Sequence, residues 1–242
     1  MKLRSMFVGA LLAVTSLAIA APVQAAYIIG HVNTTTGNDE NDGVIVESGN
    51  VDWTQPRNDP PNTDPTYGEF FFSGIRTGSF SVLQNPTLGG GPFLIQDLSG
   101  DSTDGNYTPV GFSAGISDFL QFTGGGSTWQ FVETFLQPGN LDPTTPFVFS
   151  ADSPTTSSVK ISIFGYAYDI NTPTQISTWT YIASAQFTES LGSLLARAAA
   201  GPIETSWSGS LDVQAVPEPA TLLTFGLGAM YLARRRRNQK KS

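Results

Sequence analysis

Between Trp179 and Phe187 the chain alternates strictly, because every second residue is apolar and the residues between are polar or mixed. The apolar positions are Trp179, Tyr181, Ala183, Ala185 and Phe187. A period of about two residues belongs to a β-strand with one buried face, since successive side chains of a strand point to opposite sides. The segment is therefore predicted to be a half-buried strand that needs partners sharing its buried face.

Similar strand signals recur along the chain and are separated by turns that contain Gly, Pro or Asp. The other predicted strands are 27–32, 44–46, 68–73, 79–83, 93–98, 119–122, 128–136, 147–150, 159–168 and 203–213. Helix-forming stretches are scarce, and 25 Gly and 16 Pro agree with a turn-rich β protein. We predict an all-β fold, a single β-sandwich or jelly-roll of about ten strands.

Two local features interrupt this pattern. The apolar parity changes near Gly165, from Val159, Ile161 and Ile163 to Phe164, Tyr166 and Tyr168, which predicts a β-bulge because one inserted residue exchanges the two faces of a strand. Leucines at 191, 194 and 195 and an alanine at 198 have helical spacing, and Gly201-Pro202 follows them. This predicts one short amphipathic helix that packs through its leucines.

The N-terminal segment has the pattern of a removable signal peptide. Lys2 and Arg4 precede an uncharged apolar run from Met6 to Ala21, and Val23-Gln24-Ala25 supplies small residues at a signal peptidase site. We predict cleavage between Ala25 and Ala26, so residues 1–25 are absent from the mature chain. The alternative is an uncleaved anchor.

The C-terminal segment combines three features in a fixed order. Pro217-Glu218-Pro219 precedes an uncharged segment from Ala220 to Ala233, and Arg234, Arg235, Arg236 and Arg237 follow it. The uncharged segment is short for a span, which takes about 20 apolar residues. An arginine cluster marks the cytoplasmic end of a span, so the residues before it lie across the membrane. We predict a C-terminal transmembrane sorting helix.

This order of features resembles the PEP-CTERM sorting signal, a tail that is also catalogued as the ice-binding protein C-terminal domain without implying that its carriers bind ice. The resemblance implies processing by an exosortase, an inner-membrane transpeptidase-like enzyme that cleaves near Pro217-Glu218-Pro219. It also implies a Gram-negative source that makes exopolysaccharide. The alternative is an ordinary tail-anchored membrane protein in which Pro-Glu-Pro occurs by chance.

The chain thus divides into a signal peptide (1–25), one β ectodomain (26–213) and a sorting tail (214–242). Residues 26–216 hold 4 basic and 19 acidic side chains, so their formal net charge is 4 − 19 = −15. Such a charge repels phosphate backbones, which excludes nucleic acid as a natural partner. The chain has no cysteine, so packing alone stabilises it and no thiol nucleophile or thiolate metal site exists.

Two acidic loops are candidates for calcium, although we expect no cofactor. Asp39 and Asp42 lie in the sequence NDENDG, and Asp101 and Asp104 lie in a second acidic loop that ends at Gly105. A hard cation prefers several oxygen ligands, which such loops offer. The EF-hand spacing is not met, because position twelve of the first loop is Gly49. A solvated hairpin turn is the alternative for both loops.

The residues that could carry catalysis form no convincing set. Gly111-Phe112-Ser113-Ala114-Gly115 fits the G-x-S-x-G pattern, but that pattern needs a helix after the serine and a histidine later in the chain. His31, the single histidine, lies upstream. No pair among the acidic residues stands out as a glycosidase pair. We therefore expect no enzymatic activity and no catalytic residue.

An aromatic platform for sugar rings is the remaining candidate for a ligand site, because sugar rings stack on aromatic faces. The candidates are Trp53, Tyr67, Trp129, Trp179, Tyr181 and Trp207. Trp179 and Tyr181 fall on the buried parity of their strand, whereas Trp53 lies in a polar stretch and is expected to be exposed. Trp53 is thus the candidate ligand-binding residue.

These patterns lead to one reading with one alternative. The chain is expected to be an exported, non-catalytic protein of the cell surface or the exopolysaccharide matrix. Its expected partners are signal peptidase, an exosortase, exopolysaccharide and, transiently, the inner membrane as an anchor. The alternative is a carbohydrate-binding module of the envelope, stabilised by calcium. A secreted hydrolase has no residue to support it.

Overall fold

The computed structural model describes residues 27–36, 44–47, 50–53, 67–83, 93–99, 107–124 and 126–216. Signal cleavage at Ala25 and Ala26, the calcium candidates (Asp39, Asp42, Asp101, Asp104), Pro217-Glu218-Pro219, the sorting helix and the arginine cluster (Arg234, Arg235, Arg236, Arg237) lie outside the described residues. Within the part that is described, no helix is long and apolar enough to cross a membrane. The prediction of a membrane-spanning sorting segment therefore stays a prediction from sequence.

The described residues form twelve strands, one α-helix and one 3₁₀ helix. The first strands are β1 (Gly30–Thr35), β2 (Val44–Glu47), β3 (Asn50–Trp53), β4 (Tyr67–Arg76), β5 (Phe93–Gln96) and β6 (Gly111–Gly124). The later strands are β7 (Ser127–Leu136), β8 (Val148–Ser153), β9 (Thr156–Asp169), β10 (Thr172–Phe187), β11 (Ile203–Thr205) and β12 (Ser208–Ala215). The helices are η1 (Gly78–Val82) and α2 (Leu191–Ala200).

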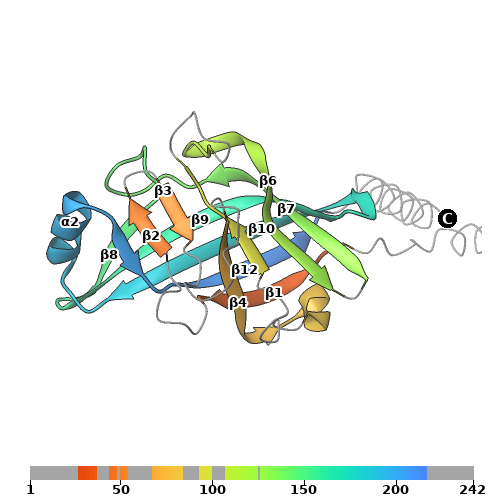
Figure 1. The fold of residues 1–242 in the computed structure, drawn as a ribbon, viewed down its shortest axis with the longest axis horizontal. Helices are drawn as coiled ribbons and strands as arrows, with labels where there is room; N and C mark the ends of the chain where they lie inside the picture. The colour runs from red at the N-terminus through yellow and green to blue at the C-terminus, as the bar shows by residue number, and fades with distance from the viewer. Residues whose placement is uncertain are drawn as a thin grey trace, which may run out of the picture.

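Eight antiparallel strands close into a barrel, which corrects the predicted sandwich or jelly-roll. Their order is β10-β12-β1-β4-β5-β6-β7-β9, and β9 pairs back with β10 (Figure 1). The long strand β10 pairs along one edge with β12 and along the other with β9. Since every strand of this ring has two partners, two facing sheets with free edges do not form.

Two smaller parts extend the barrel near α2. Strand β8 pairs with the half of β9 that β7 leaves free, and a separate sheet of β11, β2 and β3 bridges to the barrel through Val51 and Leu98. Helix α2 lies at the left-hand end of the molecule in Figure 1 and buries Leu194. It begins after Ser190, whose side chain accepts a hydrogen bond from the Ser193 backbone N–H and so caps the helix.

The predicted alternation is confirmed in β10 and β12. Trp179, Tyr181, Ala183, Ala185 and Phe187 are all buried, and their neighbours in β12 are the buried Gly209, Leu211 and Val213. Aromatic rings fill much of the barrel interior, and Phe119 stacks on Trp179 at 5.6 Å between centroids. An eight-stranded barrel is just wide enough for side chains to fill it, so this interior is a packed core.

The predicted bulge near Gly165 is wrong in its strand: a register shift does lie beside Gly165, but the extra residue belongs to β7 and not to β9. Strand β9 pairs with β10 without interruption through Gly165, and Ala167 and Asp169 keep the buried parity of the residues before it. The extra residue lies opposite, at Thr134 of β7, where the register shifts. A Cβ at Gly165 would collide with the Val132 carbonyl oxygen and the Trp179 indole, so glycine allows the close approach of β7.

The predicted strand at 79–83 is also wrong, because these residues belong to η1 and its C-terminal cap. Gly78 has φ of +58°, and the Ser79 N–H donates to the Ile29 carbonyl oxygen at 2.7 Å. A Cβ at Gly78 would collide with that same oxygen. Glycine therefore lets the chain turn tightly against the start of β1.

Candidate functional site

The outer wall formed by β10, β12 and β1 carries adjacent rows of polar side chains. Apolar residues of these strands point into the barrel, so the residues between them point outward. Asp212 pairs with His31 and with Thr180, while Ser210 pairs with Asn33 and Ile182. The strand register thus places these side chains in adjacent rows.

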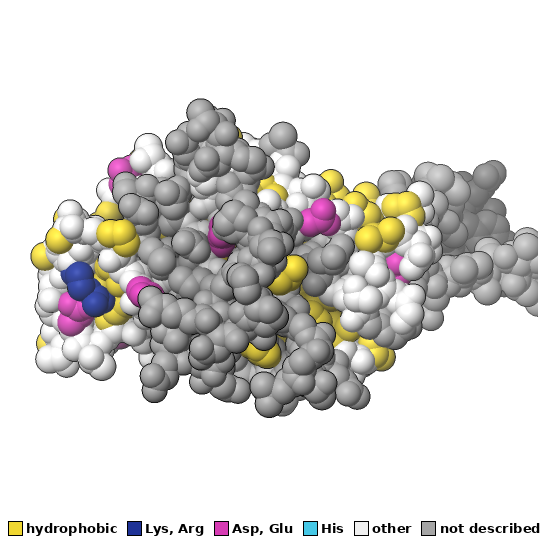
Figure 2. Space-filling model, in the orientation of Figure 1, with side chains coloured by type: hydrophobic (Ala, Val, Ile, Leu, Met, Phe, Trp, Pro, Cys, Tyr) yellow, Lys and Arg dark blue, Asp and Glu magenta, His cyan; other side chains and the backbone are white. Residues whose placement is uncertain are grey.

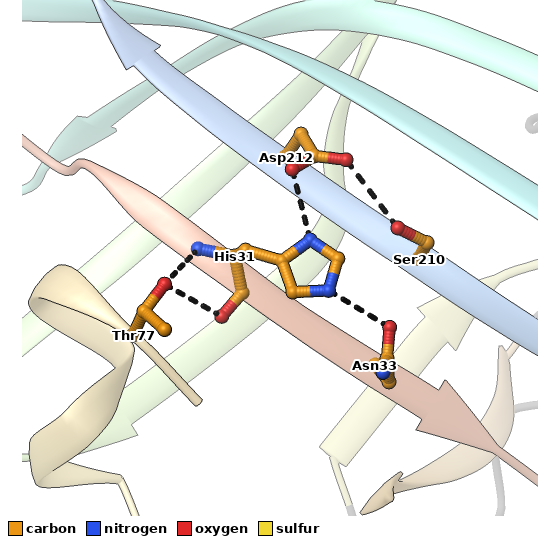
Figure 3. Close-up of polar contacts among 5 residues, drawn as sticks. All are labelled: His31, Asn33, Thr77, Ser210 and Asp212. Atoms are coloured by element: carbon orange, nitrogen blue, oxygen red, sulfur yellow. Dashed lines mark hydrogen bonds and ion pairs between the residues drawn. The ribbon is translucent and has the colours of Figure 1, made fainter. Parts of the chain in front are cut away.

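His31 lies at the centre of a hydrogen-bonded group on this wall (Figure 3). Its Nδ1 lies 2.8 Å from Asp212 Oδ1 and its Nε2 lies 2.9 Å from Asn33 Oδ1. Ser210 Oγ donates to Asp212 Oδ2 at 3.3 Å, and the His31 backbone N–H donates to Thr77 Oγ1 at 3.0 Å. Every polar side chain of the group is therefore held by another.

This group contains Ser, His and Asp but lacks the geometry of a nucleophilic triad. In such a triad the histidine accepts the proton of the serine hydroxyl. Here the Ser210 hydroxyl bonds to the carboxylate, and the Nε2 of His31 is taken by Asn33. The arrangement orients polar groups and does not activate the hydroxyl.

A groove with a volume of about 370 Å³ lies beside this group. Its lining combines hydroxyl and amide groups with one exposed aliphatic side chain: Asn33, Ser73, Ile182, Ser184, Ser208 and Ser210. Thr34 and Gly209 also line it, but Thr34 is buried and its hydroxyl bonds to Tyr181. Asn33 and Ser210 belong both to the groove and to the His31 group. The groove offers uncharged hydrogen-bonding partners and an apolar contact, the combination that neutral polyhydroxyl ligands use.

Trp53 is not exposed, contrary to the prediction. It is 1% exposed, and its ring packs against Trp207 at 4.7 Å and Tyr181 at 6.4 Å between centroids. The β11-β2-β3 sheet carries Trp53 into the core, where it lines a small apolar cavity with Trp207 and Phe147. A residue in this position cannot stack on an external sugar ring.

The exposed aromatic surface lies elsewhere, on the outer face of β6, β7 and β9. It comprises Phe112, Phe135, Phe164, Tyr166 and Tyr168. Phe112 is 86% exposed, and its ring lies 4.6 Å from that of Phe135. The Tyr168 hydroxyl donates to Gln130 Oε1 at 2.6 Å. The sequence carried a signal for this surface, because Phe164, Tyr166 and Tyr168 have the parity opposite to the buried residues of β9.

Ser113 of the G-x-S-x-G pattern lies within strand β6 and not in a turn before a helix. Its Oγ donates to Glu133 Oε2 at 3.0 Å and accepts from the Gly115 N–H. Burial raises the pKa of Glu133 to about 7, and the hydrogen bond from Ser113 partly opposes this rise. The pattern therefore marks a half-buried serine–glutamate contact in the barrel wall.

Metal ligands do not gather in the part of the chain that the structure describes. Among those residues, no group of three His, Asp or Glu side chains could hold an ion. The acidic loops predicted to bind calcium lie in other segments, so that prediction stays open.

The described barrel ends where a known motif begins. A family model of the PEP-CTERM protein-sorting motif matches residues 215–237. No curated protein and no solved structure matches the chain. The match includes the Pro-Glu-Pro sequence, the uncharged segment and the arginine cluster.

Proposed function

This chain is a PEP-CTERM protein, an exported substrate of an exosortase with a cell-surface or extracellular destination, and from this premise we propose that its barrel is a non-catalytic module that associates with exopolysaccharide. Signal peptidase removes residues 1–25, and the sorting tail holds the chain in the inner membrane until the exosortase cleaves it. The barrel is then displayed on the surface or released into the matrix.

The observation that carries this proposal is the direct junction between barrel and sorting motif. Strand β12 ends at Ala215, and the motif match begins at residue 215. No further domain separates the two, so the barrel is the part of the molecule that sorting delivers. A delivered module acts through its surface.

The groove on the β10-β12-β1 wall supports a neutral polysaccharide as the ligand. Its hydroxyl and amide groups match the donors and acceptors of sugars, and Ile182 offers an apolar contact for their C–H faces. The formal charge of −15 over residues 26–216 disfavours acidic polymers, because like charges repel. We therefore expect neutral chains to bind better than acidic ones.

The test is co-sedimentation of the exported chain with neutral and acidic polysaccharide fractions from the host. We expect the double variant Asn33→Ala, Ser210→Ala to lose binding to the neutral fraction. The matched control is Ser150→Ala with Ser158→Ala, a second exposed hydroxyl pair joined at 2.9 Å on β8 and β9. Equal binding by wild type and both double variants would exclude the groove as the binding site.

The second candidate is a carbohydrate-binding module that uses the exposed aromatic surface of β6, β7 and β9. Stacking of sugar rings on aromatic faces needs exposed rings, and Phe112 and Tyr166 are both exposed. In the same assay the double variant Phe112→Ala, Tyr166→Ala would then lose binding, and the groove variant would keep it.

A further inference from the structure

Five exposed aliphatic side chains surround the end of the barrel from which the chain passes into its sorting tail. This aliphatic rim consists of Ile29, Val82, Ile170, Ile176 and Val216. Figure 2 shows hydrophobic side chains over the right-hand part of the molecule, the end opposite α2, with acidic side chains nearby. Exposed apolar residues that gather in one place mark a surface that meets an apolar or interfacial partner.

Strand pairing and hydrogen bonds bring the rim residues to the same end. Ser177 pairs with Ala215, so Ile176 and Val216 each lie one residue beyond this last pair. The Ile29 carbonyl oxygen accepts from Ser79 of η1, the helix that contains Val82. Ile170 lies in the β9–β10 turn, and its N–H donates to Thr128 at the start of β7.

The rim is almost free of charge, although the barrel is strongly acidic. The described segments at this end are 27–30, 77–83, 123–124, 126–128, 169–177 and 214–216, and their one charged side chain is Asp169. Asp169 is buried and accepts a hydrogen bond from the Asn171 N–H. Close to the rim, Arg76 precedes the segment 77–83, and Asp212 pairs with His31 next to the Gly30–Val213 pair, with its carboxylate 2.8 Å from the His31 ring. Other charged side chains lie toward the α2 end and include Asp142, Asp152, Lys160, Glu189 and Arg197.

The short stretch of chain after Val216 limits how far this end of the barrel can lie from the membrane. Four residue steps lead from Val216 to Ala220, where the uncharged segment begins. Four steps span at most roughly 14 Å in any conformation. The headgroup layer on one side of a bilayer is about 5–8 Å thick. If the uncharged segment enters the membrane, the rim lies at or beside the headgroups.

We propose that the aliphatic rim is a membrane-contact surface, on which the barrel rests against the inner membrane while its sorting tail is anchored there. The inference depends on the transient anchorage included in the proposed function. An uncharged rim allows close approach, because its exposed side chains are apolar and carry no charge that anionic lipid would repel. The contact presents the residues after Val216 at the membrane surface, where an inner-membrane exosortase acts.

The test uses the chain from residue 26 to 242 in vesicles of phosphatidylethanolamine and phosphatidylglycerol. Since the chain has no cysteine, single variants carry one label each. Val82→Cys and Ile176→Cys place an environment-sensitive fluorophore on the rim. Leu141→Cys is the matched control, because Leu141 is 56% exposed and Val82 58%, and it follows the opposite end of β7.

With vesicles, we expect the emission of the fluorophore at positions 82 and 176 to shift to the blue and to be quenched by a quencher attached to the lipid headgroups. We expect neither change for the fluorophore at position 141. Adding Ile176→Glu to the Val82→Cys variant reduces the quenching, whereas adding Leu141→Glu does not. A chain that fails to float with vesicles overturns the anchorage and the inference with it. A chain that floats with equal signals at all three positions overturns the inference alone. A blue shift without vesicles indicates a second copy on the rim and also overturns it.

Discussion

Replacing Glu133 by glutamine is expected to stabilise the barrel at alkaline pH and to remove one source of its pH dependence. The Glu133 side chain is buried in the wall of β7, and its Oε1 has no hydrogen-bond partner among the described residues. Burial raises the pKa of Glu133 from 4.5 to about 7. The folded state therefore binds this proton more tightly than the unfolded state does.

The sign and size of the effect follow from this difference in pKa. Stability from Glu133 is fully present below about pH 4.5 and is lost as the pH rises through about 7, because the buried carboxyl must then ionise. Each tenfold change in proton affinity is worth about 1.4 kcal/mol, so a pKa difference of about 2.5 corresponds to about 3 kcal/mol. Glutamine stays neutral and avoids this loss.

Urea unfolding followed by tryptophan fluorescence at about pH 4 and about pH 8 measures the effect. We expect the free energy of unfolding of Glu133→Gln, relative to wild type, to rise by about 3 kcal/mol between these conditions. Asp142→Asn is the control, because hydrogen bonds from Thr144 lower the pKa of Asp142 and place its titration below this window. A flat or falling difference for Glu133→Gln would refute the reasoning.

Two further substitutions test the packing of the barrel by urea unfolding. Gly165→Ala places a Cβ against the Val132 carbonyl oxygen and the Trp179 ring, so we expect the free energy of unfolding to fall by about 1–3 kcal/mol. An unchanged urea midpoint would show that β7 moves away without cost. Thr34→Val leaves the buried Tyr181 hydroxyl without its 2.9 Å partner and is expected to cost about 1–3 kcal/mol. Adding Tyr181→Phe removes the unpaired group and restores part of the loss; no recovery in the double variant would contradict this account.

Local elements of the fold could be predicted because their signals lie within a few consecutive residues. The alternation in β10 follows from side chains that point to opposite faces, and α2 follows from leucine spacing and a Gly-Pro stop. Closure into a barrel could not be predicted in this way. Alternation has the same form in a sandwich and in a barrel, and the pairing of β9 with β10 and of β10 with β12 is set by register between distant segments.

The errors at candidate site residues have the same origin. Trp53 lies in a polar stretch, but the pairing of β3 with β2 turns its ring into the core. Phe164, Tyr166 and Tyr168 look like a change of buried face, whereas the displaced residue is Thr134 in the neighbouring strand. The His31 group joins β1 to β12, and Asp212 lies far from His31 in sequence, so only the strand register brings them together.

Mass spectrometry of the mature protein isolated from the host tests the central claim most directly. We expect an N-terminus at Ala26 and a C-terminus near Pro217-Glu218-Pro219, with the barrel intact and Arg234 to Arg237 absent. Recovery of chains that end at Ser242 with the arginine cluster present would contradict exosortase processing and leave the barrel as the permanent outer part of an anchored protein.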